Sequence, residues 1–182
     1  MHDDILRVLI SAEEIAARIG TLAEEIRRDY QAILPVGGQL LMISVLKGSV
    51  CFMADLMRAL DLPVTIDFMA VSSYGSGTVT SGAVRILKDL ETPVEGRHLL
   101  IVEDILDSGK TLSYLMNMLE TMRPASIRLC TLLDKPSRRQ APVALHYRGF
   151  EVPDEFLVGY GLDYAERYRN LPFVGVLRPE AQ

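Results

Sequence analysis

The sequence predicts an α/β fold with a mainly parallel sheet and helices on its faces. Nearly continuous apolar runs of strand length occur at residues 40–45, 99–102 and 127–133. Because these runs lack polar alternation, both faces of each strand should be covered. Segments with helical apolar spacing lie between the runs, and this alternation is typical of parallel sheets. The 182 residues suffice for one domain with a sizeable core.

The first predicted element is a helix after Ser11. Ser11 and Glu14 form a capping box, and one apolar stripe follows, made of Ile15, Ile19, Leu22 and Ile26. After the strand at 40–45 the chain reaches Lys47 and Gly48, which precede a helix predicted over 51–60. A glycine and a cation between a strand and a helix suit an anion site, but a plain turn with a solvated lysine explains them equally well.

A third strand is predicted over residues 64–72, where apolar and polar side chains alternate. Residues 73–82 follow and are rich in small polar side chains around a single aromatic residue, Tyr74. Their composition alone favours a plain hairpin loop.

Residues 98–111 hold the most informative pattern. The apolar run stops at Glu103 and Asp104, and Asp-Ser-Gly-Lys-Thr at 107–111 precedes a helical pattern that starts at Leu112. Ligands of open α/β sheets bind at such C-terminal strand ends. Small residues, hydroxyls and a helix start suit a phosphate, whereas carboxylates repel phosphate and suit the vicinal hydroxyls of a ribose, directly or through Mg²⁺. The stretch therefore predicts a ribose 5-phosphate site.

Two other interpretations of this stretch are weaker. A buried strand with a polar turn and a helix cap explains the apolar run and one polar residue, but not the complementary set of residues at 107–111. A P-loop would need glycine at position 104, which is Asp104.

The C-terminal part combines a strand at 127–133, an irregular stretch with strand-like Val143 and Leu145, and a last strand at 174–177. Lys135 follows the first of these strands, where a solvated lysine is the usual explanation.

Four further residues of this part have ordinary structural explanations. Periodicity alone assigns Phe156 and Leu157 to the core. A structural salt bridge would account for Asp163 and Arg169, which lie in a polar turn at 159–170.

Composition limits the class of partner. A net charge of −5 offers no footprint for nucleic acid or an anionic membrane. No apolar run approaches membrane-spanning length, and Met-His-Asp-Asp lacks the basic start of a signal peptide. We therefore expect a cytoplasmic protein without nucleic acid or membrane partners.

Residues 102–112, Val-Glu-Asp-Ile-Leu-Asp-Ser-Gly-Lys-Thr-Leu, closely resemble the phosphoribosyl pyrophosphate (PRPP) motif of type I phosphoribosyltransferases. The surrounding residues are similar to the bacterial-type hypoxanthine-guanine, or 6-oxopurine, branch, and the resemblance extends over about 40–177. It implies a mainly parallel five-stranded sheet within a single phosphoribosyltransferase domain spanning 1–182. It also implies a small hood formed mainly by about 136–170 and N-terminal residues.

The resemblance implies a purine-salvage enzyme. The reaction would be Mg²⁺-dependent transfer of phosphoribosyl from PRPP to N9 of hypoxanthine or guanine, giving IMP or GMP and pyrophosphate. Homodimers or homotetramers would be expected. The sequence does not rank hypoxanthine, guanine and xanthine as substrates.

The resemblance also implies a role for each matching residue. Ribose and its 5-phosphate would be bound by Glu103, Asp104, Asp107, Ser108, Gly109, Lys110 and Thr111, with Asp107 as the proton carrier. Pyrophosphate would be bound by Lys47, Gly48 and Arg169, and the purine by Lys135, Phe156, Leu157 and Asp163. The metal ligands would be Glu103, Asp104 and Asp163, and a loop with Ser73 and Tyr74 would close over the reaction centre.

Two alternative functions share parts of this pattern. A transferase for adenine, orotate or a pyrimidine would keep PRPP, but Lys135, Phe156 and Asp163 argue against it. A PRPP-sensing regulator of nucleic acid would need a basic surface or a DNA-binding domain, and this sequence shows neither.

Overall fold

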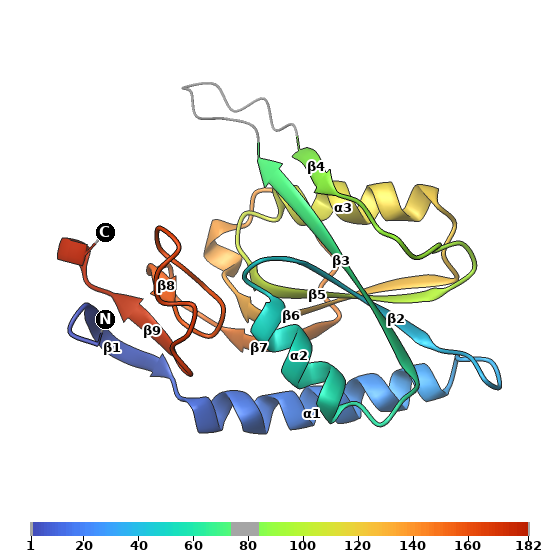
Figure 1. Cartoon of the computed structure of the whole chain (residues 1–182), viewed down its shortest axis with the longest axis horizontal. Coiled ribbons are helices and arrows are strands. Elements are labelled where there is room, and N and C mark those ends of the chain that lie inside the picture. The colour runs from blue at the N-terminus through green and yellow to red at the C-terminus, as the bar shows by residue number, and fades with distance from the viewer. Residues whose placement is uncertain (1, 74–83, 182) are drawn as a thin grey trace.

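A computed structural model describes residues 2–73 and 84–181. The large sheet of this part has six strands in the order β4-β3-β2-β5-β6-β7 (Figure 1). The strands are β2 (Leu40–Leu46), β3 (Val64–Ser73), β4 (Val84–Lys88), β5 (His98–Leu106), β6 (Ser126–Asp134) and β7 (Tyr147–Glu151). Five of them are parallel, and β4 pairs antiparallel with β3 at the edge. The predicted α/β fold with a mainly parallel sheet is confirmed, and the antiparallel edge strand β4 is a sixth strand beyond the five predicted.

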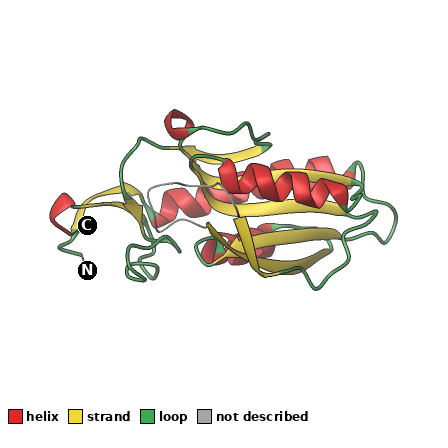
Figure 2. Cartoon of the chain, turned by 90° about the horizontal axis from the view of Figure 1, so that it is seen from above, coloured by secondary structure: helices red, strands yellow, loops and turns green. Residues whose placement is uncertain are grey.

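Three helices cover the two faces of this sheet. The helices α1 (Ala12–Gln31) and α2 (Val50–Ala59) pack on one face with Leu40 and Met42, whereas α3 (Lys110–Thr121) packs on the other with Leu41 and Ile43 (Figures 1 and 2). Successive strand residues point to opposite faces. Because both faces are covered, β2 is apolar at nearly every position, as the sequence pattern indicated.

A small antiparallel sheet lies beside the large one, in the order β1-β9-β8. Its strands β1 (Ile5–Ile10), β8 (Leu157–Val158) and β9 (Val174–Leu177) bring the two ends of the chain together (Figure 1). The sheet corresponds to the predicted hood: β1 is N-terminal and β8 lies within the predicted range of about 136–170, whereas β9 follows that range. The short 3₁₀ helices η1 (Pro136–Arg138) and η2 (Pro179–Ala181) complete the elements of the described residues.

Two local expectations were wrong. The strand expected at Val143 and Leu145 lies instead at β7, which joins the large sheet beside β6; both residues pack as irregular chain against the α3 side of the core. Glu103 and Asp104 do not end their strand, because β5 continues to pair with β6 up to Leu106. Backbone pairing does not depend on whether a side chain is charged.

Tyr74 and the rest of the predicted closing loop, 74–83, lie outside the described residues; Ser73 is the last residue of β3. No helix in the described ranges is long and apolar enough to cross a membrane.

Candidate active site

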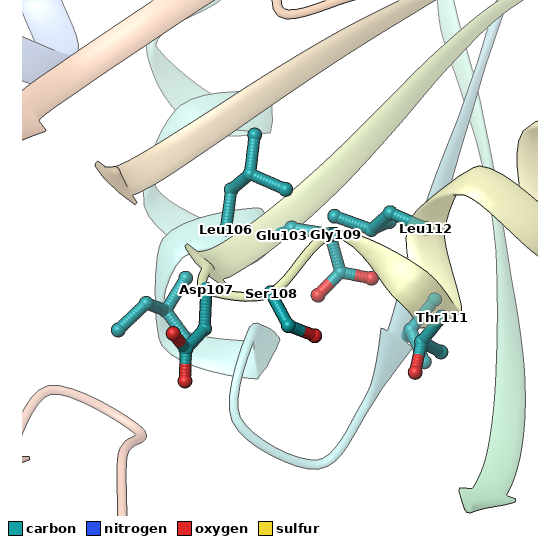
Figure 3. A pocket seen from close by; sticks show the side chains of 9 residues that line it. Glu103, Leu106, Asp107, Ser108, Gly109, Thr111 and Leu112 are labelled. Carbon is teal, nitrogen blue, oxygen red and sulfur yellow. The ribbon is translucent and has the colours of Figure 1, made fainter. Parts of the chain in front are cut away.

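The C-terminal ends of β2, β5 and β6 meet at one edge of the large sheet, and the predicted site residues follow them. A cavity of about 140 Å³ opens at the end of β5 and the start of α3, and its lining includes Glu103, Asp107, Ser108, Gly109 and Thr111 (Figure 3). Figure 3 shows the two carboxylates and the two hydroxyls gathered around this short segment. Five of the seven predicted ribose-phosphate residues therefore line one cavity, and Asp104 and Lys110 are not part of its lining. Lys110 begins α3 and is exposed.

The loop from Asp107 to Gly109 is fixed by its backbone. The carbonyl of Ser108 accepts hydrogen bonds from the amides of Gln140 and Ala141, at 2.9 and 3.1 Å. Gly109 has a φ of +79°, and a Cβ there would lie 2.8 Å from the Ala141 carbonyl oxygen. Only glycine adopts this backbone conformation without strain, so the glycine of the motif has a structural reason.

Arginines 138 and 139 reach the same loop from η1, and sequence reasoning missed both. Arg139 Nη1 donates to the Asp107 carbonyl at 3.0 Å, while its other nitrogen pairs with the buried Asp134. Arg138 Nε lies 3.0 Å from Asp107 Oδ1 and its Nη1 lies 3.2 Å from Asp154. Their only sequence signal was a pair of cations shortly after Lys135.

The acidic pair, Glu103 and Asp104, lies near the end of β5, where Asp104 contacts the loop that follows β2. Glu103 is 7% exposed, and burial raises the pKa of its carboxyl well above the usual range, with the charge of Asp104 adding to the effect. Burial also raises the pKa of Asp104. A Cβ at Gly48 would overlap the Asp104 carboxylate, so glycine lets the β2 loop approach the acids closely.

A polar loop of the hood closes the other side of the site. Gly161, at a φ of +99°, packs so closely that a Cβ would overlap the Gly48 carbonyl oxygen. Arg169 donates to the Gly161 carbonyl at 2.8 Å and pairs with Asp163 at 2.8 Å. Lys47, which follows a cis Leu46–Lys47 peptide, pairs with Glu166 at 3.2 Å. The three residues predicted for pyrophosphate are thus neighbours.

The predicted purine residues lie at the base of the hood. Lys135 is 7% exposed, its Nζ donates to the Glu155 carbonyl at 2.7 Å, and burial lowers the pKa of its ammonium group. Phe156 is 41% exposed and meets the Tyr164 ring edge-on at 5.3 Å, so its assignment to the core by periodicity was wrong. Leu157 is buried in β8, as that same pattern indicated. Asp163 and Arg169 pair with each other, so the structural salt bridge weighed as an alternative for each residue is present.

The known proteins that are similar to this chain agree with one another in family. Residues 9–165 match the phosphoribosyl transferase domain family. The hypoxanthine-guanine phosphoribosyltransferase of Bacillus subtilis is 55% identical over 179 residues, which are 98% of this chain and 97% of that protein. The chain belongs to the hypoxanthine-guanine branch of the type I phosphoribosyltransferases.

Solved structures agree with this assignment. A hypoxanthine phosphoribosyltransferase from Staphylococcus aureus superposes with a TM-score of 0.93 at 46% identity, covering 99% of this chain and 95% of that one. A Trypanosoma cruzi hypoxanthine phosphoribosyltransferase in a ternary complex with substrates gives the same TM-score and identity, with 98% of each chain covered. The predicted fold and enzyme class are confirmed, as is the predicted purine-salvage activity, the transfer of phosphoribosyl from PRPP to 6-oxopurines.

Some relatives are longer. The bifunctional protein TilS/HprT of Listeria innocua is 52% identical over 180 residues, which are 99% of this chain but 27% of that protein.

Proposed function

We propose that the edge formed by the ends of β2, β5 and β6 binds PRPP, Mg²⁺ and a purine together. There the enzyme transfers phosphoribosyl to N9 of hypoxanthine or guanine, giving IMP or GMP and pyrophosphate. The observation that carries this proposal is the close packing of the β2 loop, the end of β5 and the hood loop, in which Gly48 lies against both Asp104 and Gly161. Cations, buried carboxylates and a phosphate-sized cavity therefore share one site.

The ribose 5-phosphate half of the site follows from the end of β5. The amides and hydroxyls of residues 107–111 suit the 5-phosphate, at the positive end of the α3 dipole. Glu103 and Asp104 suit the ribose hydroxyls, because carboxylates accept hydrogen bonds from hydroxyl groups.

The pyrophosphate half lies between the β2 loop and the hood. Lys47 and Arg169 supply positive charge, and Gly48 offers a backbone amide beside them. Breaking the bond between ribose and pyrophosphate builds positive charge on the sugar and negative charge on the leaving group. Cations held at the leaving group therefore stabilise the transition state more than the ground state.

The donor set fits Mg²⁺, which prefers oxygen ligands and often binds through one or two carboxylates plus substrate phosphates. Burial disfavours the charged forms of Glu103 and Asp104, and a bound cation would offset that cost. Arg169 links the third carboxylate to this pair, because it forms an ion pair with Asp163 and its charge also acts on Asp104. These carboxylates would hold the ion together with the phosphate oxygens of the substrate, and the ion when bound neutralises charge on the pyrophosphate.

A preassembled cage is not required. Within residues 2–73 and 84–181 no three potential metal ligands of the His, Cys, Asp or Glu type are grouped for a metal. That arrangement suits an ion that enters with its phosphate ligands.

The purine would lie between the hood and Asp107. The half-exposed Phe156 ring offers a face for stacking. An ammonium group has three donor hydrogens, so Lys135 keeps donors for a 6-oxo group beyond its bond to Glu155. The backbone near Leu157 and Asp163 would bind the remaining purine edge.

Asp107 is proposed to exchange the proton at purine N7. Its buried Oδ1 forms an ion pair with Arg138 Nε at 3.0 Å, and no other group of the described residues donates to it. A carboxylate beside the base subsite, paired with only one cation, can still exchange a proton with the base.

A turnover assay with PRPP, Mg²⁺ and a panel of bases tests the proposal. We expect product from hypoxanthine or guanine, little from adenine or orotate, and loss of turnover when Mg²⁺ is chelated. Preferred use of adenine, or full activity without a divalent cation, would contradict it.

Location and assembly are further parts of the proposal, and family membership supports them. We propose a cytoplasmic homodimer or homotetramer. Light scattering on the eluting protein would measure its mass, and a monomer at micromolar concentration would contradict the proposed assembly.

A further inference from the structure

The tip of the hood loop has an unusual backbone for its sequence. Tyr164 and Arg167 exchange amide-to-carbonyl hydrogen bonds of 3.2 and 3.0 Å, and Ala165 and Glu166 turn the chain between them. Their φ angles are +50° and +62°. A two-residue hairpin turn with positive φ at both central residues strongly prefers Asn-Gly or Asp-Gly, because other side chains are strained there. A glutamate at the second position therefore calls for another reason.

The side chain of Glu166 supplies that reason. Its carboxylate accepts from Lys47 Nζ at 3.2 and 3.3 Å and from Arg169 Nη2 at 3.4 Å. The hydrogen bond from Lys47 lowers the pKa of Glu166, so the carboxylate is charged near neutral pH. The backbone amide of Glu166 donates to Asp163 Oδ2 at 2.9 Å and holds the tip in place. One carboxylate thus contacts both cations of the pyrophosphate subsite.

We propose that Glu166 is an internal counter-anion that occupies the pyrophosphate subsite of the free enzyme and yields it to substrate pyrophosphate. This inference rests on the proposed function, in which Lys47 and Arg169 bind pyrophosphate. The pyrophosphate of PRPP must displace the carboxylate when it binds, and the carboxylate returns to the cations when pyrophosphate leaves. Glu166 therefore weakens binding of both PRPP and pyrophosphate.

The expected effect is modest because the pair is accessible. The side chains of Lys47 and Glu166 are each 65% exposed, and exposed ion pairs are weak. We expect Glu166→Gln to lower the KM for PRPP and the inhibition constant of pyrophosphate about two- to fivefold. The KM for hypoxanthine should not change. Glu95→Gln is the matched control, because Glu95 pairs with Arg123 at 2.7 Å on an exposed surface outside the site.

Glu166→Gly separates this role from a structural one. Glycine removes the carboxylate and also relieves the positive-φ strain, so it should lower the KM for PRPP as Glu166→Gln does while keeping Tm at or above that of the wild type. A lower Tm with an unchanged KM would make Glu166 a structural residue and overturn the inference.

Lys47→Met distinguishes failure of this inference from failure of the proposed function. It should raise the KM for PRPP, and the gain from Glu166→Gln should shrink in its background, since one of the two released cations is gone.

An unchanged KM in Lys47→Met would refute the pyrophosphate assignment of Lys47, and the inference with it. A raised KM in Lys47→Met with no gain from Glu166→Gln would overturn only the inference. A raised KM for PRPP or a raised Mg²⁺ requirement in Glu166→Gln would make Glu166 a ligand and also overturn it.

Discussion

The two loops that face each other across the site are held in different ways. The phosphate loop, residues 107–111, is held by backbone hydrogen bonds from Gln140 and Ala141 and by a glycine that leaves no room for a side chain. The hood loop, residues 159–169, packs its backbone on the β2 loop at Gly161, but it meets Lys47 of that loop through Glu166, and both of these side chains are 65% exposed. Buried backbone contacts are hard to exchange, whereas exposed ion pairs are weak and exchange readily with another anion.

This difference matches what each loop is proposed to bind. The 5-phosphate is present in both PRPP and the nucleotide product, so its loop can be preorganised without slowing the reaction. Pyrophosphate arrives as part of PRPP but is cut from the sugar and leaves as a separate product, so its cations benefit from a competing partner. The comparison predicts that changes in the phosphate loop reduce turnover or PRPP binding, whereas loss of the hood carboxylate improves PRPP binding.

The largest effect is expected on kcat, from a substitution that changes the chemistry of one side chain in the phosphate loop. Asp107→Asn conserves shape but removes the proton acceptor, so kcat should fall by about 10²–10⁴-fold, a range typical of general acid–base catalysis. The KM for PRPP should change little, because the backbone contacts that hold the loop remain. Steady-state kinetics of the purified variant measure both constants.

Asp154→Asn is the matched control, because Asp154 shares the partner Arg138 with Asp107. It should retain most of the kcat. A wild-type kcat in Asp107→Asn would remove Asp107 from the chemistry.

The next largest effect should be a weaker binding of the base, from a substitution that changes neither loop. Lys135→Ala removes a charged donor, and hydrogen bonds to charged groups are worth about 1.5–3 kcal/mol, so the KM for hypoxanthine and guanine should rise about 10- to 100-fold. The KM for PRPP should stay near that of the wild type. An unchanged KM for both bases would exclude Lys135 from the purine subsite.

A third change tests whether the phosphate loop is rigid. Gly109→Ala places a Cβ 2.8 Å from the Ala141 carbonyl oxygen at a φ of +79°. The KM for PRPP should rise about tenfold if the loop shifts at a cost of 1–3 kcal/mol. Denaturant unfolding should show a loss of stability as well.

Gly96→Ala provides the control for this change. Gly96 has a φ of +70° but nothing within 4 Å of an added Cβ, so it carries the backbone strain without the clash. It should lose less stability than Gly109→Ala and keep the KM for PRPP. Equal effects of the two substitutions on stability, with no change in KM, would mean that the phosphate loop is not braced by residue 141.

The two loops also differ in how far the sequence predicted them. Strand β5 and the phosphate loop were predictable because an apolar run, a glycine and a helix start are local signals. Gly161 and Glu166 were not, since their importance comes from contact with Gly48 and Lys47, more than a hundred residues away. Periodicity cannot register such contacts.

Phe156 and β1 show the same limit at the level of the fold. Periodicity assigned Phe156 to the core, but the antiparallel pairing of β8 with β9 leaves its ring half-exposed. Strand β1 was not predicted, although its sequence Ile-Leu-Arg-Val-Leu-Ile is mostly apolar; its middle is exposed, and it forms because β9 pairs with it from the other end of the chain. Pairing between distant strands is set by tertiary structure more than by local propensity.

The smallest expected effect sharpens the comparison most, because it concerns a single hydrogen bond behind the phosphate loop. Arg139 and Arg148 both pair with the buried Asp134, but only Arg139 also donates to the Asp107 carbonyl. Arg139→Lys can keep one charged contact with Asp134 and loses the planar fork that reaches both acceptors. A hydrogen bond worth about 0.5–1.5 kcal/mol implies a two- to tenfold loss in kcat/KM for PRPP. Arg148→Lys should leave kcat/KM unchanged, and if both variants lost the same activity, the bond to Asp107 would have no special role in bracing the loop.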